Sequence, residues 1–137
     1  MYIQNKTKEY YHDAHLIWSC QYHIIFCTKY RRKVLENGID QRLKEIVLEN
    51  QTIHKYKIIE IEVMPDHVHA LIEVNPKVGV HKAISIIKGL TSNILRKEFK
   101  QLRSRLPTLW THGKFVSTVG SVSLEVIKKY IEDQKNK

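Results

Sequence analysis

The 137-residue sequence has few of the residues that mark secreted, linker-rich or membrane proteins. It holds 2 cysteines, 3 prolines and 5 glycines, and no apolar run approaches the roughly 18 residues that cross a bilayer. The polar, tyrosine-rich stretch over residues 1–13 has no apolar core of the kind found in a secretory signal. Hydrophobic residues still make up 42%, which excludes disorder over most of the chain. We expect a soluble cytoplasmic protein.

Acidic residues are also scarce. Asp and Glu number 14 against 23 Lys and Arg, which gives a formal net charge of +9. Such an excess on a small domain favours a polyanionic partner, above all nucleic acid. A generic basic surface is the alternative, and the charge by itself identifies neither DNA nor RNA.

The two cysteines, Cys20 and Cys27, flank His23 and raise the question of a zinc cluster. They fall in a strand-like run, where an odd separation places the two thiols on opposite faces. A shared metal is therefore disfavoured, and filling of the core is the better interpretation.

Hydrophobic periodicity predicts a single domain of alternating strands and helices. Strands are expected over about 15–28, 56–64, 67–74 and 114–119, helices over about 40–54, 80–99 and from Ser121 or Ser123 to Gln134, and a basic loop over 100–113. In the first strand Trp18, Cys20, Tyr22, Ile24 and Phe26 alternate with polar residues, and in the second Ile59, Ile61 and Val63 are expected on one face with Glu60 and Glu62 on the other. Gly89 interrupts the long helix at a cost of about 1 kcal/mol relative to Ala, which indicates a packing or ligand reason.

This order of elements is the split βαβ pattern of an α+β protein. It predicts an antiparallel sheet with two helices on one face and an additional C-terminal helix. The opposite face of the sheet is expected to be open, and RNA-binding sheets of this architecture use that face for their ligand.

Two histidines on the third strand are candidate metal ligands. His67 and His69 are two residues apart, so both imidazoles leave the strand on the face opposite Val68. His-x-His is a weak motif in a chain with 8 histidines, and surface histidines are its ordinary explanation. Glu62 and Asp66 lie close enough in sequence to orient an imidazole by accepting its second N–H.

The last predicted helix carries a second pair of candidates. Tyr130 and Gln134 are four residues apart and share a helical face. The alternative interpretation is a half-buried packing tyrosine and a solvated glutamine at the helix end.

Five blocks of this sequence resemble one family in order and spacing. They are 27–35 (CTKYRRKVL), 64–71 (MPDHVHAL), 87–89 (IKG), 109–110 (LW) and 130–134 (YIEDQ). Together they resemble the single-tyrosine transposases of the HUH superfamily, of the insertion sequence 200/605 type, which include the small REP-associated tyrosine transposases. The resemblance runs from about His15 to Gln134, so we expect residues 15–137 to form one transposase domain after a leader, 1–14, of unassigned role.

The resemblance implies a ferredoxin-like fold and an obligate homodimer. It implies that His67 and His69 bind a divalent metal, Mg²⁺ or Mn²⁺, with Gln134 as third ligand and Tyr130 as nucleophile. In such transposases the tyrosine helix can complete the site of the other subunit. The substrate is single-stranded DNA at insertion-sequence ends, recognised through a subterminal hairpin, and the enzyme acts in the cytoplasm on nucleoid DNA.

The chemistry of these residues agrees with that mechanism. A phenol with a pKa of about 10 needs stabilisation of its phenolate, and a divalent cation can neutralise and orient the scissile phosphate. Attack would join Tyr130 to the 5′ phosphate and leave a free 3′ hydroxyl, so that the reverse reaction can join a new strand. Candidate DNA-binding residues are Lys29, Arg31, Arg32, Lys88, Arg96 and Lys114, with Trp110 or Phe115 as a stacking partner for a base.

Three alternatives stay open at this point. The first is a non-catalytic module of ferredoxin-like fold that binds single-stranded nucleic acid. The second is a metal-dependent hydrolase in which water attacks and Tyr130 is incidental. The third is a domesticated relative that no longer mobilises an element.

Overall fold

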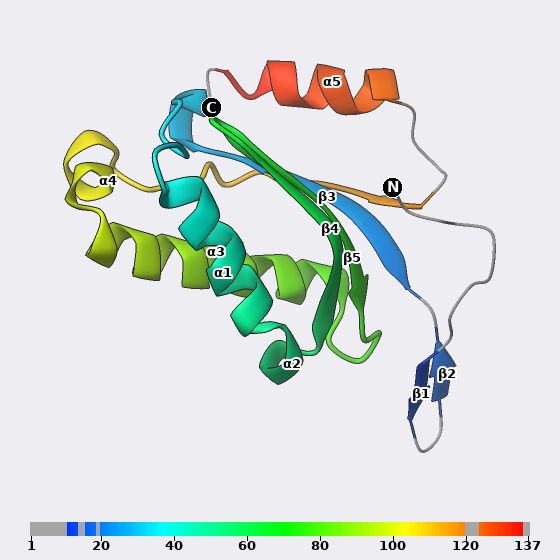
Figure 1. Cartoon of the computed structure of the whole chain (residues 1–137). Coiled ribbons are helices and arrows are strands. Elements are labelled where there is room, and N and C mark those ends of the chain that lie inside the picture. Colours follow the sequence, from blue (N-terminus) through cyan, green and yellow to red (C-terminus); the bar gives the residue numbers. More distant parts are fainter. Residues whose placement is uncertain (1–10, 14–15, 19, 120–123, 136–137) are drawn as a thin grey trace.

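A four-stranded antiparallel sheet organises the computed structural model, which describes residues 11–13, 16–18, 20–119 and 124–135. The strand order is β4-β5-β3-β6, and a separate two-stranded sheet pairs β1 with β2 (Figure 1). The strands are β1 (Tyr11–Asp13), β2 (Leu16–Trp18), β3 (Gln21–Cys27), β4 (Tyr56–Met64), β5 (His67–Val74) and β6 (Phe115–Thr118). The helices are α1 (Ile39–Glu49), α2 (Gln51–His54), α3 (Val80–Glu98), α4 (Lys100–Arg105) and α5 (Leu124–Asp133), with a 3-10 turn at Lys29–Arg31.

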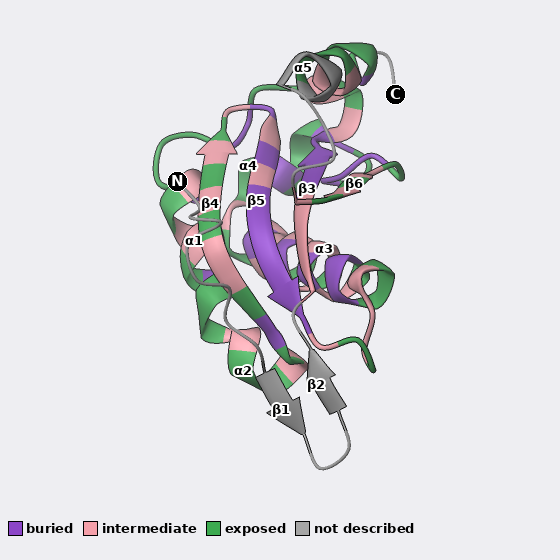
Figure 2. Cartoon of the chain, turned by 90° about the vertical axis from the view of Figure 1, so that its right-hand side faces the viewer, coloured by how far each residue is buried: buried purple, intermediate pink, exposed green. Residues whose placement is uncertain are grey.

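The α+β prediction is confirmed. Alternate residues of β3 and β5 point toward α1 and α3, which cover one face of the sheet. Figure 2 shows β5 buried along most of its length between β4 and β3. The core on this face contains Ile24, Phe26, Val68, Ala70 and Ile72 from the sheet, and Leu43, Ile46, Ala83, Ile84, Ile87 and Leu95 from the helices.

A β-bulge corrects the expected face of Ile59. The register with β5 slips between Ile58 and Glu60, so that Ile58 pairs with Ile72 while Glu60 pairs with Leu71. The extra residue inverts the alternation before it. Ile58 therefore packs against the core in place of Ile59, and Ile61 follows the expected pattern.

Three other boundaries differ from the sequence expectations. The strand expected over 15–28 is two strands, because β2 pairs with β1 and only β3 joins the main sheet. The helix expected over 40–54 breaks at Asn50, whose side-chain amide donates to Ile46 O at 2.8 Å. The expected loop after residue 99 contains α4, which buries Leu102. These short elements carry too little periodicity to be read from the sequence.

The last helix, α5, lies on the face of the sheet opposite α1 and α3 (Figure 1). Tyr130 and Ile131 pack there against Ile25, Cys27 and Phe115. The face that was expected to be open is therefore partly covered by this chain's own C-terminal helix. The candidate capping residues at 121 and 123 lie outside the described part of the chain, and none of the described helices is long and apolar enough to cross a membrane.

Candidate active site

The histidine pair lies on the face of β5 that α5 partly covers. His67 pairs with Cys27 and His69 with Ile25 across the β3–β5 register, so both rings leave the sheet away from the helix-covered core. Val68, between them, is 1% exposed and points into that core. The shared face of the two imidazoles, expected from their spacing, is confirmed.

His67 is oriented by a carboxylate. Its Nδ1–H donates to Asp66 Oδ1 at 2.8 Å, and Asp66 Oδ2 accepts from Arg31 Nε at 2.7 Å. Burial raises the pKa of Asp66, but the hydrogen bonds from Arg31 and His67 outweigh it and hold that pKa below its ordinary value. Asp66 is therefore ionised at neutral pH, and the Nε2 atom of His67 is left to bind a ligand.

Arg31 also connects this carboxylate to α5. Its Nη1 donates to Ile131 O at 3.2 Å and to Glu132 Oε1 at 3.5 Å. Arg31 ends a tight turn with a φ of +53°, a left-handed value that aims its side chain back toward the sheet. One side chain thus links Asp66, which directly precedes β5, with α5, which bears Tyr130 and ends just before Gln134.

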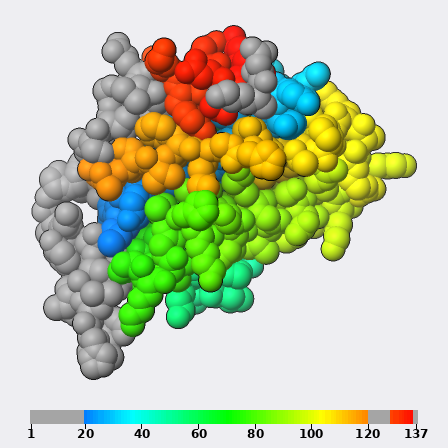
Figure 3. All heavy atoms as spheres, turned by 180° about the vertical axis from the view of Figure 1, so that it is seen from behind, coloured from blue at the N-terminus to red at the C-terminus, as the bar shows by residue number. Residues whose placement is uncertain are grey.

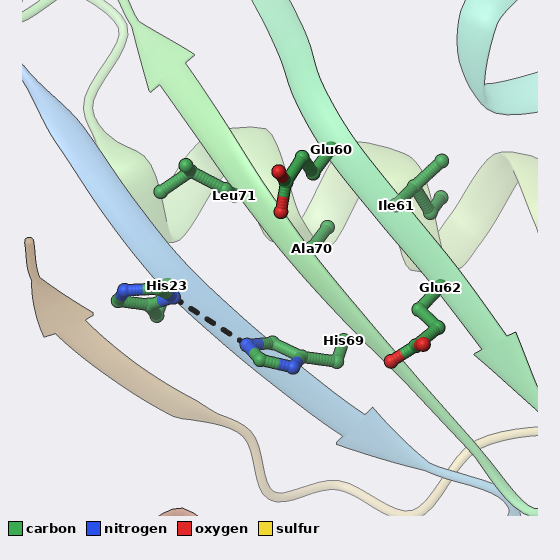
Figure 4. A pocket seen from close by; sticks show the side chains of 7 residues that line it. All are labelled: His23, Glu60, Ile61, Glu62, His69, Ala70 and Leu71. Atoms are coloured by element: carbon green, nitrogen blue, oxygen red, sulfur yellow. Dashed lines mark hydrogen bonds between the residues drawn. The ribbon is translucent and has the colours of Figure 1, made fainter. Parts of the chain in front are cut away.

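His69 faces a third histidine. Its Nε2 lies 3.4 Å from His23 Nδ1, and the ring centroids are 5.5 Å apart (Figure 4). Burial, and then the neighbouring His23, lower the pKa of His69, so the ring is neutral at neutral pH, as a metal ligand must be. The two rings, with Glu60, Glu62 and Leu71, line a pocket of about 400 Å³.

Tyr130 and Gln134 bury their polar ends together. The Oη of Tyr130 and the Oε1 of Gln134 are both closed to solvent and have no hydrogen-bond partner. Both lie against Gly113, where a Cβ would be 3.6 Å from the phenol oxygen and 3.7 Å from the amide oxygen. Burial, and then Cys27, raise the pKa of Tyr130 to about 12, so the phenol is protonated at neutral pH.

The residues fit the implied metal. Among the described residues, no three His, Cys, Asp or Glu side chains gather closely enough to hold an ion. Gln134 offers a buried amide oxygen without a partner, a group that costs free energy unless something binds it. Gln134, the carboxylate-oriented His67 and the neutral His69 are donors of a type that a divalent ion can bind.

Lys88 supports the segment that seats Tyr130. Its Nζ donates to the carbonyl oxygens of Thr111, His112 and Gly113 at 2.8, 3.4 and 3.3 Å. Burial, and then the charge of Lys114, lower the pKa of Lys88 to about 8. Sequence reasoning placed Lys88 among DNA contacts and missed both this role and the position of Gly113. The 87–89 block was the available signal, but it did not say what the lysine binds.

The other predicted DNA contacts lie in different surroundings. Lys29 Nζ lies 5.0 Å from the centre of the Tyr30 ring, and Arg96 Nη1 donates to Leu106 O at 3.3 Å. Arg32 is exposed, and Lys114 is half-buried next to β6. Their contacts with DNA stay predictions.

Stacking of a base on Trp110 is excluded in this arrangement. The indole is 7% exposed, packs edge-on against Phe26 and donates its Nε1–H to Thr91 Oγ1 at 3.0 Å. Phe115 stacks against Tyr130, with ring centroids 5.2 Å apart. Trp110 is therefore a core residue, which its position in a basic segment did not reveal.

Comparison with known proteins decides the family. A family model described as "Transposase IS200 like" matches residues 16–134. The chain belongs to the IS200-like transposase family. The family resemblance to the insertion sequence 200/605 HUH transposases is thereby confirmed, and the chain is a transposase.

Curated relatives and solved structures agree with this family. The transposase for insertion sequence element IS200 of Salmonella typhimurium is 32% identical over 127 residues, covering 89% of this chain and 84% of the relative. The ISDra2 transposase TnpA of Deinococcus radiodurans is 32% identical over 123 residues, with 88% of each chain covered.

Two solved structures share the fold. A crystal structure described as a candidate transposase of Deinococcus radiodurans superposes with a TM-score of 0.83 at 29% identity, covering 90% of this chain and 97% of the other. A REP-associated tyrosine transposase bound to a REP hairpin gives a TM-score of 0.52 at 12% identity, covering 89% of this chain and 68% of the other, a likeness of fold alone.

Proposed function

We propose that this transposase cleaves and rejoins single-stranded DNA at insertion-sequence ends through a 5′-phosphotyrosine intermediate on Tyr130. The observation that carries the proposal is the pair of buried, unpartnered oxygens, Tyr130 Oη and Gln134 Oε1, against Gly113. A structural tyrosine and a solvated glutamine would not bury both polar ends without partners. Arg31 supports the proposal as well, because it joins the helix that bears Tyr130 to the carboxylate that orients His67.

The reaction we assign to Tyr130 is an exchange of phosphodiesters. Its oxygen attacks phosphorus, the bond from phosphorus to the 3′ oxygen breaks, and a free 3′ hydroxyl leaves. The enzyme keeps the 5′ phosphate as a tyrosine ester, whose energy serves the later joining step. With a pKa of about 12, Tyr130 loses its proton only when positive charge is brought to it.

His67, His69 and Gln134 are the residues we assign to a divalent metal, Mg²⁺ or Mn²⁺. When bound, such an ion supplies charge that neutralises the scissile phosphate and holds it for in-line attack. Asp66 fixes the tautomer of His67, and the lowered pKa of His69 keeps its ring neutral. To bind an ion, His69 must turn from His23 or use its other ring nitrogen, because its Nε2 lies 3.4 Å from His23 Nδ1.

Access to Tyr130 requires movement of α5. The phenol oxygen is closed to solvent against Gly113, so a phosphate reaches it only when the helix shifts. This supports our proposal that the enzyme works as a homodimer whose tyrosine helices can act in trans. A second copy of α5 seated on Ile25, Cys27 and Phe115 would make the contacts that this chain makes with itself.

The proposed substrate is single-stranded DNA with a subterminal hairpin, in the cytoplasm and on nucleoid DNA, with no membrane partner. The net charge of +9 supports a polyanionic ligand, and a hairpin is bound by the REP-associated transposase that shares the fold. Affinity should fall steeply with salt, because lysine and arginine contacts to phosphate release counterions.

The decisive test is covalent trapping with Tyr130→Phe as the comparison. Single-stranded DNA carrying the element's own ends is incubated with Mg²⁺ or Mn²⁺, and the adduct is mapped by mass spectrometry. The wild type should carry a 5′-linked phosphate on the peptide that holds Tyr130, and the variant should bind DNA without cutting it. An adduct on another tyrosine would refute the assignment. Metal-dependent cleavage without an adduct would favour a hydrolase, and binding without cleavage would favour a non-catalytic module.

A further inference from the structure

A polar groove runs beside the candidate active site, on the surface between α3 and the segment 108–114. It encloses about 350 Å³. From α3 it is lined by Ser85, Lys88, Gly89 and Ser92, which share one helical face, and from the segment by Thr108 to His112 and by Lys114. Figure 3 shows the segment, in orange, passing between α3 and α5 on one side of the molecule.

The charges along this groove are of one sign. Lys88 and Lys114 line it, and no Asp or Glu is among its lining residues. The two ammonium groups repel each other, and this repulsion adds to burial in lowering the pKa of Lys88. Lys88 donates its N–H groups to three carbonyl oxygens. Lys114, by contrast, makes no hydrogen bond or ion pair within the described part of the chain. An anion in the groove would find Lys114 available and would relieve the repulsion.

Gly89 lines the groove without a side chain, although packing within the chain does not require a glycine there. Gly89 lies in the interior of α3, and a Cβ placed on it meets nothing within 4 Å. Gly89 has no positive φ and no close neighbour that would require a glycine. Nothing in the chain itself therefore compensates for its weakening of the helix. A side chain there would stand in the groove, which indicates that the space belongs to a ligand that approaches the helix closely.

The groove leads to the proposed nucleophile. Lys88 binds the carbonyl oxygens of residues 111–113. The last of these residues, Gly113, also lies against Tyr130 Oη. A strand that follows the groove therefore reaches the segment that covers the phenol, and it would meet Tyr130 once α5 shifts. Positive grooves of this kind bind a single-stranded backbone without needing a particular base.

We propose that this groove binds the single-stranded DNA that leads to the scissile phosphate, with one phosphate at Lys114 and the backbone crossing α3 at Gly89. The inference rests on the proposed function for the identity of the strand. Lys88 shapes the groove by holding residues 111–113, and Lys114 supplies the free charge.

The test measures DNA binding in the full chain with Tyr130→Phe as background, so that nothing is cut. Fluorescence anisotropy with labelled oligo-dT measures binding of a single strand that has no hairpin. A length of about 15 nucleotides is chosen because single-strand-binding grooves cover about 4–16 nucleotides. Gly89→Leu fills the groove at a position with free space, and Asn93→Leu, at an exposed site on α3 outside the groove, is the matched control.

Gly89→Leu should weaken oligo-dT binding at least about tenfold, while Asn93→Leu should bind as the parent does. Lys114→Gln should weaken binding and lower the slope of log affinity against log salt by about 1, with Lys97→Gln, outside the groove, as control. Gly89→Ala should raise the thermal unfolding midpoint, which shows that position 89 tolerates a side chain.

Several outcomes would overturn the proposal that the groove binds single-stranded DNA. They are an affinity of Gly89→Leu for oligo-dT equal to that of the parent, an equal loss of affinity in Asn93→Leu, no binding of oligo-dT, or tighter binding of oligo-rU than of oligo-dT. Failure of the proposed function is a separate result. A wild type that forms no tyrosine adduct, with groove variants behaving as expected, would leave a strand-binding groove on a chain without the assigned chemistry.

Discussion

Gly113 lies against Tyr130 with room for little more than a methyl group. A Cβ on the glycine would stand 3.6 Å from the phenol oxygen, which is ordinary contact. Atoms beyond that Cβ that point toward Tyr130 or Gln134 would meet the buried ends of these side chains. A larger residue at position 113 would therefore limit how closely Tyr130 and Gln134 approach this segment.

Substitution of Gly113 should separate a tolerated methyl from a disruptive branch. Gly113→Ala should keep adduct formation within a few-fold of wild type, because both contacts remain at ordinary distance. Gly113→Val should slow it about 100-fold by displacing Tyr130 by about 1 Å, while oligo-dT affinity is kept. Single-turnover kinetics of adduct formation measures both. Equal rates in the two variants would show that Gly113 does not set the seat of α5.

Two buried tyrosines should respond oppositely to loss of the hydroxyl. Tyr56 Oη donates to Val47 O at 2.5 Å, whereas Tyr130 Oη has no partner. Tyr56→Phe should lower the free energy of unfolding by about 1–2 kcal/mol, and Tyr130→Phe should leave it unchanged or raise it. Urea unfolding of both variants is the measurement. A destabilised Tyr130→Phe would mean that the hydroxyl is structural.

The Asp66 carboxylate should govern metal affinity through His67. Asp66→Asn removes the ionised acceptor that orients the imidazole and should weaken Mn²⁺ binding about 10- to 100-fold, measured by calorimetry. Glu62→Gln, at an exposed carboxylate opposite His69 in the sheet register, is the control and should change affinity far less. Unaltered Mn²⁺ binding in Asp66→Asn would remove His67 from the proposed metal site.

The pKa of Lys88 should be directly measurable and should depend on Lys114. NMR titration of the Nζ group should give a value of about 8, and Lys114→Gln should raise it toward 10.5 because a repelling charge is lost. Lys97→Gln, which leaves the groove as it is, should not change it. A Lys88 pKa that ignores Lys114 would contradict the electrostatics of the groove.

The same shift fixes the sign of a pH effect on stability. Between pH 8 and 10.5 the unfolded chain binds more protons at Lys88 than the folded chain, so this group's contribution to stability rises with pH. Lys88→Met lacks that contribution. The unfolding free energy of the wild type minus that of Lys88→Met should therefore become more positive across this window. Urea titrations at stepped pH are the measurement. A constant difference would place the Lys88 pKa outside it.

The sequence predicted what local periodicity encodes. Alternation placed Val68 in the core and His67 and His69 on the opposite face, and strand pairing preserves such a pattern. It missed the exchange of Ile58 for Ile59, because the bulge arises from the match with β5 and not from the residues of β4 themselves. Local patterns carry no information on such a register slip.

For the candidate site, too, the sequence predicted local arrangement but not contacts between distant segments. The four-residue spacing predicted that Tyr130 and Gln134 lie on the same side, and their polar ends do lie together, although α5 ends at Asp133 and Gln134 lies in the turn after it. The spacing did not show what the two side chains meet. Gly113 meets them through a segment held by Lys88, 25 residues away along the chain. Trp110 looked available for stacking because its neighbours are polar, and only the packing of Phe26 and Thr91 shows that it is a core residue.

The position of α5 at the end of the described chain has a consequence for synthesis. The ribosome makes the sheet, both histidines and the groove before it adds Tyr130 and Gln134, and β3, β5 and α3 form their core without α5. A product that stops short of Leu124 would keep the groove and lack Tyr130. Such a fragment would bind single-stranded DNA through the proposed groove without cutting it, so that premature termination would turn the transposase into a competitor of its own full-length form.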